Sequence, residues 1–187
     1  MIPRALWLAL ALIVPISPAN AHDAIAGGGP FVNGILHPVV TPAHLLSLLA
    51  LGLWIGRQER AALRRFIVAF AVALIAGLFA SPLGTLPPLV PIACAVILGC
   101  LAGGGWPWPP RLAGLISVAT AIVIGFDGGA DVWALALGIW LGAMLILLNV
   151  VNLAMRIEAA WLRIGVRIAG AWIAAIALLL LALSLRA

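Results

Sequence analysis

The feature that most constrains this chain is an apolar segment at residues 36–56 that opens with two histidines. The segment is long enough to cross a lipid bilayer, because about 20 residues at about 1.5 Å each cover the ~30 Å hydrocarbon core. His37 and His44 are two of only three histidines in the chain. Imidazole is costly to desolvate inside a membrane, so we interpret these side chains first as functional groups.

Composition extends this interpretation to the whole chain. Of its 187 residues, 66% are hydrophobic and 8% are charged, whereas a soluble domain has about 25% charged residues. Such a chain cannot cover a surface that faces water, which predicts an all-α membrane protein that has the lipid bilayer as its solvent. The ten arginines give a net charge of +5, but they lie in short loops between apolar segments. That pattern indicates membrane topology and not nucleic-acid binding.

Residues 1–21 have the pattern of a secretory signal peptide. Arg4 supplies the positive charge, residues 5–14 the apolar core, and Ala-Asn-Ala at 19–21 the cleavage site. An uncleaved first membrane helix is the alternative, but the ten apolar residues at 5–14 are short for one. We therefore predict a mature chain, residues 22–187, that forms a single membrane domain with its N-terminus outside.

Hydropathy divides the mature chain into six apolar spans, which predicts a six-transmembrane-helix bundle. A glycine-rich tether is expected at 27–30, followed by spans at 35–56, 66–82, 89–104, 112–126, 132–154 and 165–185. Six crossings from an outside start place the loops 57–65, 105–111 and 155–167 in the cytoplasm. These loops hold eight of the nine arginines of the mature chain, so the positive-inside rule and the signal peptide predict the same orientation.

His37 and His44 would lie on nearly the same face of one helix, about 10.5 Å apart along its axis. That separation is too long for both rings to bind one metal ion at about 2.1 Å. Pro42 lies between them, removes a backbone hydrogen bond and can bend the helix, while the Thr41 hydroxyl could satisfy a freed carbonyl. The pattern favours a ligand or pathway role, and a structural, hydrogen-bonding role is the alternative.

Two carboxylates, Asp127 and Asp131, follow the expected fourth span. At a spacing of four they would share a helix face, and the intervening Gly128 and Gly129 are equally compatible with a turn. At the outer mouth of a bundle these carboxylates would concentrate cations, and a plain polar loop is the alternative. His22 could also chelate a cation through its ring and the α-amino group that cleavage would create.

The other polar and small residues are interpreted as packing features. The thiols of Cys94 and Cys100 are expected to pack without forming a disulfide. Four polar side chains are expected to make interhelical hydrogen bonds: Ser117, Thr120, Asn149 and Asn152. Small residues four apart allow close helix packing and predict a compact bundle: Gly52 and Gly56, Ala69, Ala73 and Gly77, and Gly138 and Gly142.

In these features the chain resembles the HupE/UreJ family of small nickel/cobalt permeases over nearly its whole length. The family's first motif reads His-Pro, four residues, then Asp-His-Leu-Leu and a later glycine. It is matched by His37, Pro38, His44, Leu45, Leu46 and Gly52, with Ala43 in place of the aspartate. The second motif, Phe-His-Gly-x-Ala-His-Gly-x-Glu, is matched by Phe126, Gly128 and Ala130, with Asp127, Asp131 and Ala134 in place of the two histidines and the glutamate. The family's acidic residue in the third span has no counterpart in residues 89–97.

The resemblance implies inward transport of Ni²⁺ or Co²⁺ from the periplasm across the bacterial inner membrane, through a path lined by His37 and His44. Asp127, Asp131 and His22 are the further candidate metal ligands. No resident cofactor is expected, since the metal would be the transported or bound ion. Carboxylates in place of imidazoles move a site away from nickel's preference for nitrogen. The chain has no GxxxxGK[ST] loop, so transport would be secondary, facilitated or driven by a partner.

Two other functions stay open. A membrane accessory protein for hydrogenase or urease maturation would bind metal without moving it and would contact metalloenzyme partners, with a homo-oligomer also compatible. A structural subunit that has lost its metal site is the other, and Ala43 together with the two aspartates, Asp127 and Asp131, favours it. No GxSxG or HExxH motif and no cysteine–histidine pair on one span is present, so we do not expect an enzyme.

Overall fold

The computed structural model of the protein describes residues 27–105, 108–129 and 132–186. The expected signal peptide, His22 and Asp131 lie outside these residues, and the expectations about them stay predictions. The described residues contain no strand, in agreement with the all-α prediction. They form α2 (Gly29–Val40), α3 (Pro42–Ile55), α4 (Arg60–Ala80), the short 3-10 turn η2 (Ser81–Leu83), α5 (Leu89–Gly104), α6 (Pro110–Gly128), α7 (Trp133–Met155) and α8 (Ala160–Ser184).

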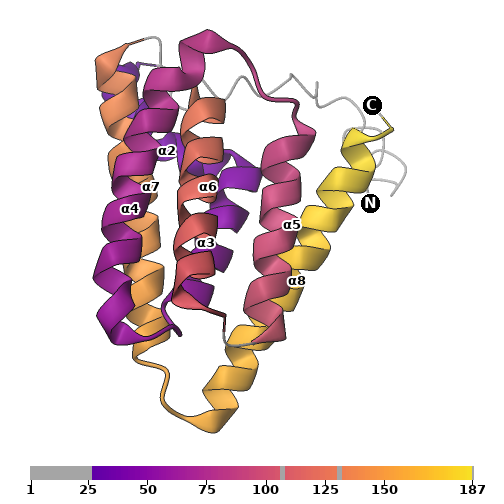
Figure 1. The fold of residues 1–187 in the computed structure, drawn as a ribbon. Helices are drawn as coiled ribbons and strands as arrows, with labels where there is room; N and C mark the ends of the chain where they lie inside the picture. The colour runs from indigo at the N-terminus through magenta and orange to yellow at the C-terminus, as the bar shows by residue number, and fades with distance from the viewer. Residues whose placement is uncertain (1–26, 106–107, 130–131, 187) are drawn as a thin grey trace, which may run out of the picture.

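Helix α3 lies at the centre of the bundle (Figure 1). Ten of its 14 residues are buried, and α5 and α7 both pack against it. Around this centre, α8 packs on α5, α4 packs on α6, and α2 packs on α7. Most of α3 is apolar around its whole circumference, which is typical of a helix in the interior of a membrane bundle.

The expected first span consists of two helices. α2 and α3 are bent by 70° relative to each other at Thr41, whose backbone is extended (φ −94°, ψ 103°). A proline disfavours helical backbone at the residue before it, and Pro42 takes the first turn of α3, where its missing N–H leaves no hydrogen bond unmade. The expected bend at Pro42 is thus present, but the Thr41 hydroxyl does not satisfy a carbonyl. It has no hydrogen-bond partner among the described residues, and the backbone N–H of Thr41 donates to the His37 carbonyl (3.0 Å).

The helix lengths confirm a multi-pass membrane protein and leave six crossings as a prediction. Four helical segments are long and apolar enough to cross a membrane, and the bent pair α2–α3 makes a fifth if it crosses as one span. α5 has 16 residues, a length of about 24 Å, which is shorter than the ~30 Å hydrocarbon core. α2 also begins earlier than expected, because Gly29 and Pro30 belong to its first turn and not to a tether.

Eight of the nine described arginines, all except Arg186, lie in or next to the α3–α4, α5–α6 and α7–α8 connections, which lie at one end of the bundle (Figure 1). We call this the arginine-rich end. Some arginines that were expected in loops are helical, because α4 begins at Arg60, and Arg163 and Arg167 lie in the first two turns of α8. The opposite end carries the end of α6, the start of α7 and the C-terminal end of α8.

Glycines allow the helices to approach closely, as the small-residue spacing predicted. Where α2 crosses α7, a Cβ added to Gly34 would lie 2.9 Å from the Cα of Gly138. A Cβ added to Gly52 of α3 would lie 2.7 Å from the Val150 side chain of α7. Real Cβ atoms essentially never come within 3.0 Å of such neighbours. These contacts therefore position α2 and α3, and with them the two histidines, against α7.

Candidate cation site at the broken span

His37 and His44 approach each other across the break. His37 lies in the last turn of α2 and is 5% exposed, while His44 lies in the first turn of α3 and is fully buried. Their ring centroids are 5.3 Å apart and their planes are inclined at 53°. An unbroken helix would separate the two residues by about 10.5 Å along its axis. The break therefore brings the two imidazoles together in the protein interior, away from lipid.

Asp127 contacts His44 from a distant part of the chain. It lies in the last turn of α6, which ends at Gly128 and is followed by Gly129 in left-handed backbone. Whether Asp127 and Asp131 share a helix face stays a prediction, because Asp131 lies outside the described residues. Its Oδ2 lies 2.8 Å from Nε2 of His44, a pair separated by 83 residues in sequence. The Asp127 side chain is 25% exposed whereas that of His44 is fully buried. The carboxylate is thus the accessible member of the pair, and it satisfies a ring N–H that burial would otherwise leave unpaired.

The bond to Asp127 determines what the second nitrogen of His44 can do. An ionised carboxylate only accepts hydrogen bonds, so Nε2 of His44 carries the donated hydrogen. Nδ1 of the neutral ring then keeps its lone pair. This Nδ1 is buried and has no hydrogen-bond partner in the part of the chain that the structure describes. Metal-binding histidines are commonly oriented by a carboxylate in this way. His44 is therefore suited to bind a transition-metal cation through Nδ1.

A pocket of about 380 Å³ is lined in part by Asp127 and lies near the end of the bundle opposite the arginine-rich end. Ala43, next to His44, forms part of its wall, together with the beginnings of α3 and α5 and the last turns of α8. Most of the described lining is apolar, and Asp127 is its one charged side chain. A carboxylate between low-dielectric walls focuses the local field and attracts cations, so the pocket provides an approach to the pair.

The described residues contain no group of three or more His, Cys, Asp and Glu side chains that could hold a metal ion. Of the five predicted ligands, the structure brings His37, His44 and Asp127 into a row of contacts. His22 and Asp131 lie outside the described residues, so their part in a site stays a prediction. The arrangement is thus an open row of donor groups and not a closed cage.

A second group of polar side chains, formed by Ser47, Cys94 and Thr120, continues from this row toward the arginine-rich end. Ser47 lies three residues after His44 on α3, and Thr120 lies seven residues before Asp127 on α6; both are buried. The Cys94 thiol of α5 donates to the Thr120 hydroxyl at 3.7 Å, and Ser47 also interacts with this thiol. Helical periodicity could have revealed the row, because spacings of three and seven place residues on one helix face.

The prediction that four polar side chains make interhelical hydrogen bonds is largely wrong. Ser117, Thr120 and Asn149 donate to carbonyl groups of their own helices, and Asn152 accepts from Arg156. A hydroxyl in an apolar helix bonds readily to the carbonyl four residues earlier, which satisfies the group without a second helix. Among these side chains, only Thr120 also has a partner on another described helix, the thiol of Cys94.

The sequence matches one known protein family over most of its length. The family model described as HupE / UreJ protein matches residues 10–180, a range that includes both histidines of the break and Asp127. No curated protein and no solved structure matches the chain. Since the family match covers most of the sequence, the chain belongs to the HupE/UreJ family.

Proposed function

We propose that the protein carries a divalent transition-metal cation, Ni²⁺ or Co²⁺, inward across the bacterial inner membrane by secondary or facilitated transport. The family is associated with nickel and cobalt transport or with urease and hydrogenase accessory roles. The observation that carries the proposal is the contact between the buried His44 and the partly exposed Asp127 at the break of the first span. Broken helices in transporters commonly form ion sites, because non-helical backbone at membrane depth is tolerated where it lines a cavity.

The donor chemistry supports nickel or cobalt as the cation. Imidazole nitrogen suits these metals, and the carboxylate of Asp127 offsets part of a divalent charge. Conduction also requires that an ion leave its site, so weak binding at successive positions is better suited to transport than a closed cage. The open row of His37, His44 and Asp127 has this character. The pocket beside Asp127 supplies the outer approach if the arginine-rich end faces the cytoplasm, as the positive-inside rule predicts.

The test is metal accumulation in cells that express the protein. His37→Ala and His44→Ala are each expected to reduce Ni²⁺ and Co²⁺ uptake by at least tenfold, since each removes a donor group from the path. Asn149→Ala is the matched control, because Asn149 is exposed and bonds only within α7. Membrane levels of all four proteins are compared on immunoblots. Equal accumulation by the wild type and both histidine variants would rule out this path.

A second candidate function is a membrane accessory protein for urease or hydrogenase maturation. The contact between His44 and Asp127 is compatible with it, because an imidazole and a carboxylate can bind a cation whether or not the cation is then moved. Such a protein would bind Ni²⁺ in detergent without accumulating it in cells. Transport and accessory function are therefore separated by measuring Ni²⁺ binding by calorimetry alongside uptake.

A further inference from the structure

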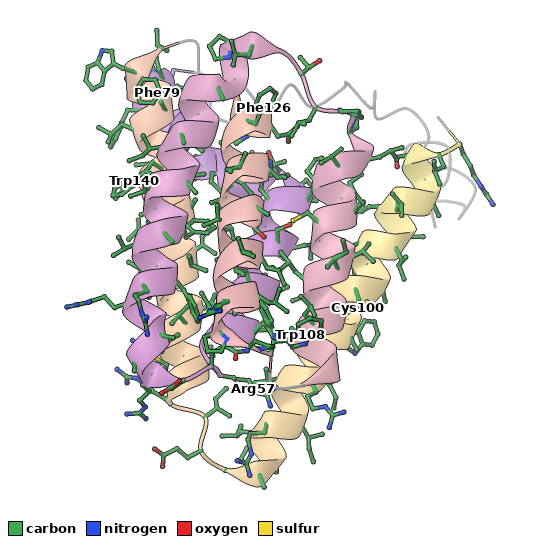
Figure 2. All side chains as sticks on the ribbon, viewed as in Figure 1. Arg57, Phe79, Cys100, Trp108, Phe126 and Trp140 are labelled. Carbon is green, nitrogen blue, oxygen red and sulfur yellow. The ribbon has the colours of Figure 1, made fainter. Side chains whose placement is uncertain are left out.

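A second pocket, of about 350 Å³, lies at the arginine-rich end, far along the bundle from the candidate cation site. Trp54, Arg57, Gln58 and Glu59 line it from the end of α3 and the following loop, and Trp108 lines it from the α5–α6 connection. Figure 2 shows Arg57 and Trp108 together at this end of the molecule. The transport path proposed above makes no use of this pocket.

The buried indole N–H of Trp54 indicates that this pocket binds a ligand. Trp54 is 2% exposed, and its Nε1 atom is buried without a hydrogen-bond partner among the described residues. An indole N–H is a donor only, so its partner must be an acceptor. A buried donor left unsatisfied destabilises the protein, whereas a bound acceptor group would satisfy it.

The Arg57 guanidinium, which lines the same pocket as Trp54, is close to other positive charges. Arg57 lies near Arg163 and Arg167 of α8, and its partial burial together with these two charges lowers the pKa of Arg57 from its ordinary value. Arg167 also donates from Nε to the Gly103 carbonyl (3.2 Å), which holds its side chain near the α5–α6 connection. Glu59 is the one carboxylate of the described lining, and it is exposed. The local excess of positive charge therefore favours an anion.

We propose that this pocket binds the phosphate group of an anionic phospholipid headgroup, with the Arg57 guanidinium and the Trp54 indole N–H as its donors. Guanidinium forms strong charge-assisted hydrogen bonds with phosphate. Basic pockets between membrane helices on the cytoplasmic side are a general form of headgroup site, and tryptophan at a helix end is typical of the headgroup level. The volume of about 350 Å³ corresponds to about twelve water molecules at ~30 Å³ each, which leaves room for the glycerol part of a headgroup beside the phosphate.

The test is lipid retention by the full-length protein in nanodiscs of phosphatidylcholine that contain a minor fraction of phosphatidylglycerol. After extraction, native mass spectrometry is expected to show one phosphatidylglycerol molecule retained per protein. Arg57→Gln and Trp54→Phe are each expected to reduce this retention by about tenfold, because each removes one donor to a charged group. Trp54→Phe keeps most of the aromatic volume, and size-exclusion chromatography checks that the variants remain folded.

Two controls make the result specific. Arg156→Gln removes the same charge at the same end from an exposed residue outside the pocket lining and should leave retention unchanged. Inorganic phosphate is added as a competitor: displacement of the lipid at millimolar concentration would support the phosphate site and identify free phosphate as a competing source. Retention that is equal in the wild type, Arg57→Gln and Trp54→Phe, or a loss that Arg156→Gln reproduces, would overturn the proposal.

Discussion

Asp127 acts on His44 in two ways, through its negative charge and through the ring nitrogen that it occupies. The 2.8 Å contact with Nε2 leaves Nδ1 of a neutral His44 as the nitrogen with a lone pair. The same carboxylate lines the pocket through which we expect a cation to arrive. Removing the charge while keeping the shape therefore separates electrostatic attraction from packing.

Asp127→Asn should reduce Ni²⁺ uptake by about 10- to 100-fold, the usual effect of losing a carboxylate that orients a metal-binding histidine. Asparagine can still accept a hydrogen bond from His44, so the fold should be retained and the loss should come from charge. Uptake of radioactive nickel at a fixed membrane level of protein is the measurement. Glu158→Gln removes an exposed carboxylate at the arginine-rich end and serves as the control. A loss of equal size in both variants would contradict a specific role for Asp127.

Ala43→Asp should increase the apparent affinity for Ni²⁺ by about tenfold or more, because a second carboxylate would join Asp127 in the wall of the same pocket. Ala43 is 8% exposed but lines the pocket, so the new carboxylate can extend into it. The concentration of Ni²⁺ at half-maximal uptake is compared with that of Ala43→Ser, which adds a polar group without charge. An affinity unchanged from that of the serine variant would show that the pocket is not on the path of the ion.

The break between α2 and α3 determines the geometry of the site. Pro42 allowed the bend to be predicted, because a proline removes a backbone hydrogen bond from a helix. The 70° angle could not be predicted, since it depends on how α2 packs against α7 through Gly34 and Gly138. The partner of His44 could not be predicted either, because Asp127 lies 83 residues away and no local pattern relates the two positions.

Hydrogen bonds inside the helices were the least predictable feature. A serine or threonine in an apolar span satisfies its hydroxyl equally well on its own helix or on a neighbour, and the sequence does not distinguish the two. Ser117 bonds to its own helix, whereas Thr120 bonds to its own helix and also accepts from Cys94. By contrast, the span predicted at 89–104 matches both ends of α5, because proline and glycine signals mark the boundaries of this apolar segment.

Gly138→Val should lower the free energy of unfolding by about 1–3 kcal/mol, the usual effect of overpacking a close contact. A Cβ at Gly138 would lie 2.9 Å from the Cα of Gly34 and would overlap the Phe31 carbonyl oxygen, so α2 would have to move away from α7. Denaturation in detergent, followed by circular dichroism, is the measurement. The matched control is Gly165→Val on α8, where an added Cβ meets nothing within 4 Å. Equal stability of the two variants would contradict the close α2–α7 packing.

The distribution of charge over the whole molecule predicts its orientation. Eight of the nine described arginines lie at the arginine-rich end of the bundle, while the pocket beside Asp127 lies near the other end. By the positive-inside rule the arginine-rich end faces the cytoplasm, so the pocket would open to the periplasm. Inward transport requires this orientation.

Cysteine labelling can measure the orientation directly. In a background with Cys94 and Cys100 replaced by serine, Gly84→Cys should react with a membrane-impermeant maleimide added to cells with a permeabilised outer membrane. Glu158→Cys should react only after the inner membrane is opened, because it lies in the connection between α7 and α8. Both residues are exposed, so local burial does not explain a difference. The reverse labelling pattern would place the pocket on the cytoplasmic side.

Ni²⁺ flux into proteoliposomes that contain only the purified protein is the most direct test of whether the histidines at the break meet a transported ion. A lumenal metal-sensitive dye should report entry of Ni²⁺ with the wild-type protein and at least a tenfold slower entry with His44→Gln, at equal protein incorporation. Flux at the level of empty liposomes for the wild type, or equal flux for the wild type and His44→Gln, would contradict transport through this site.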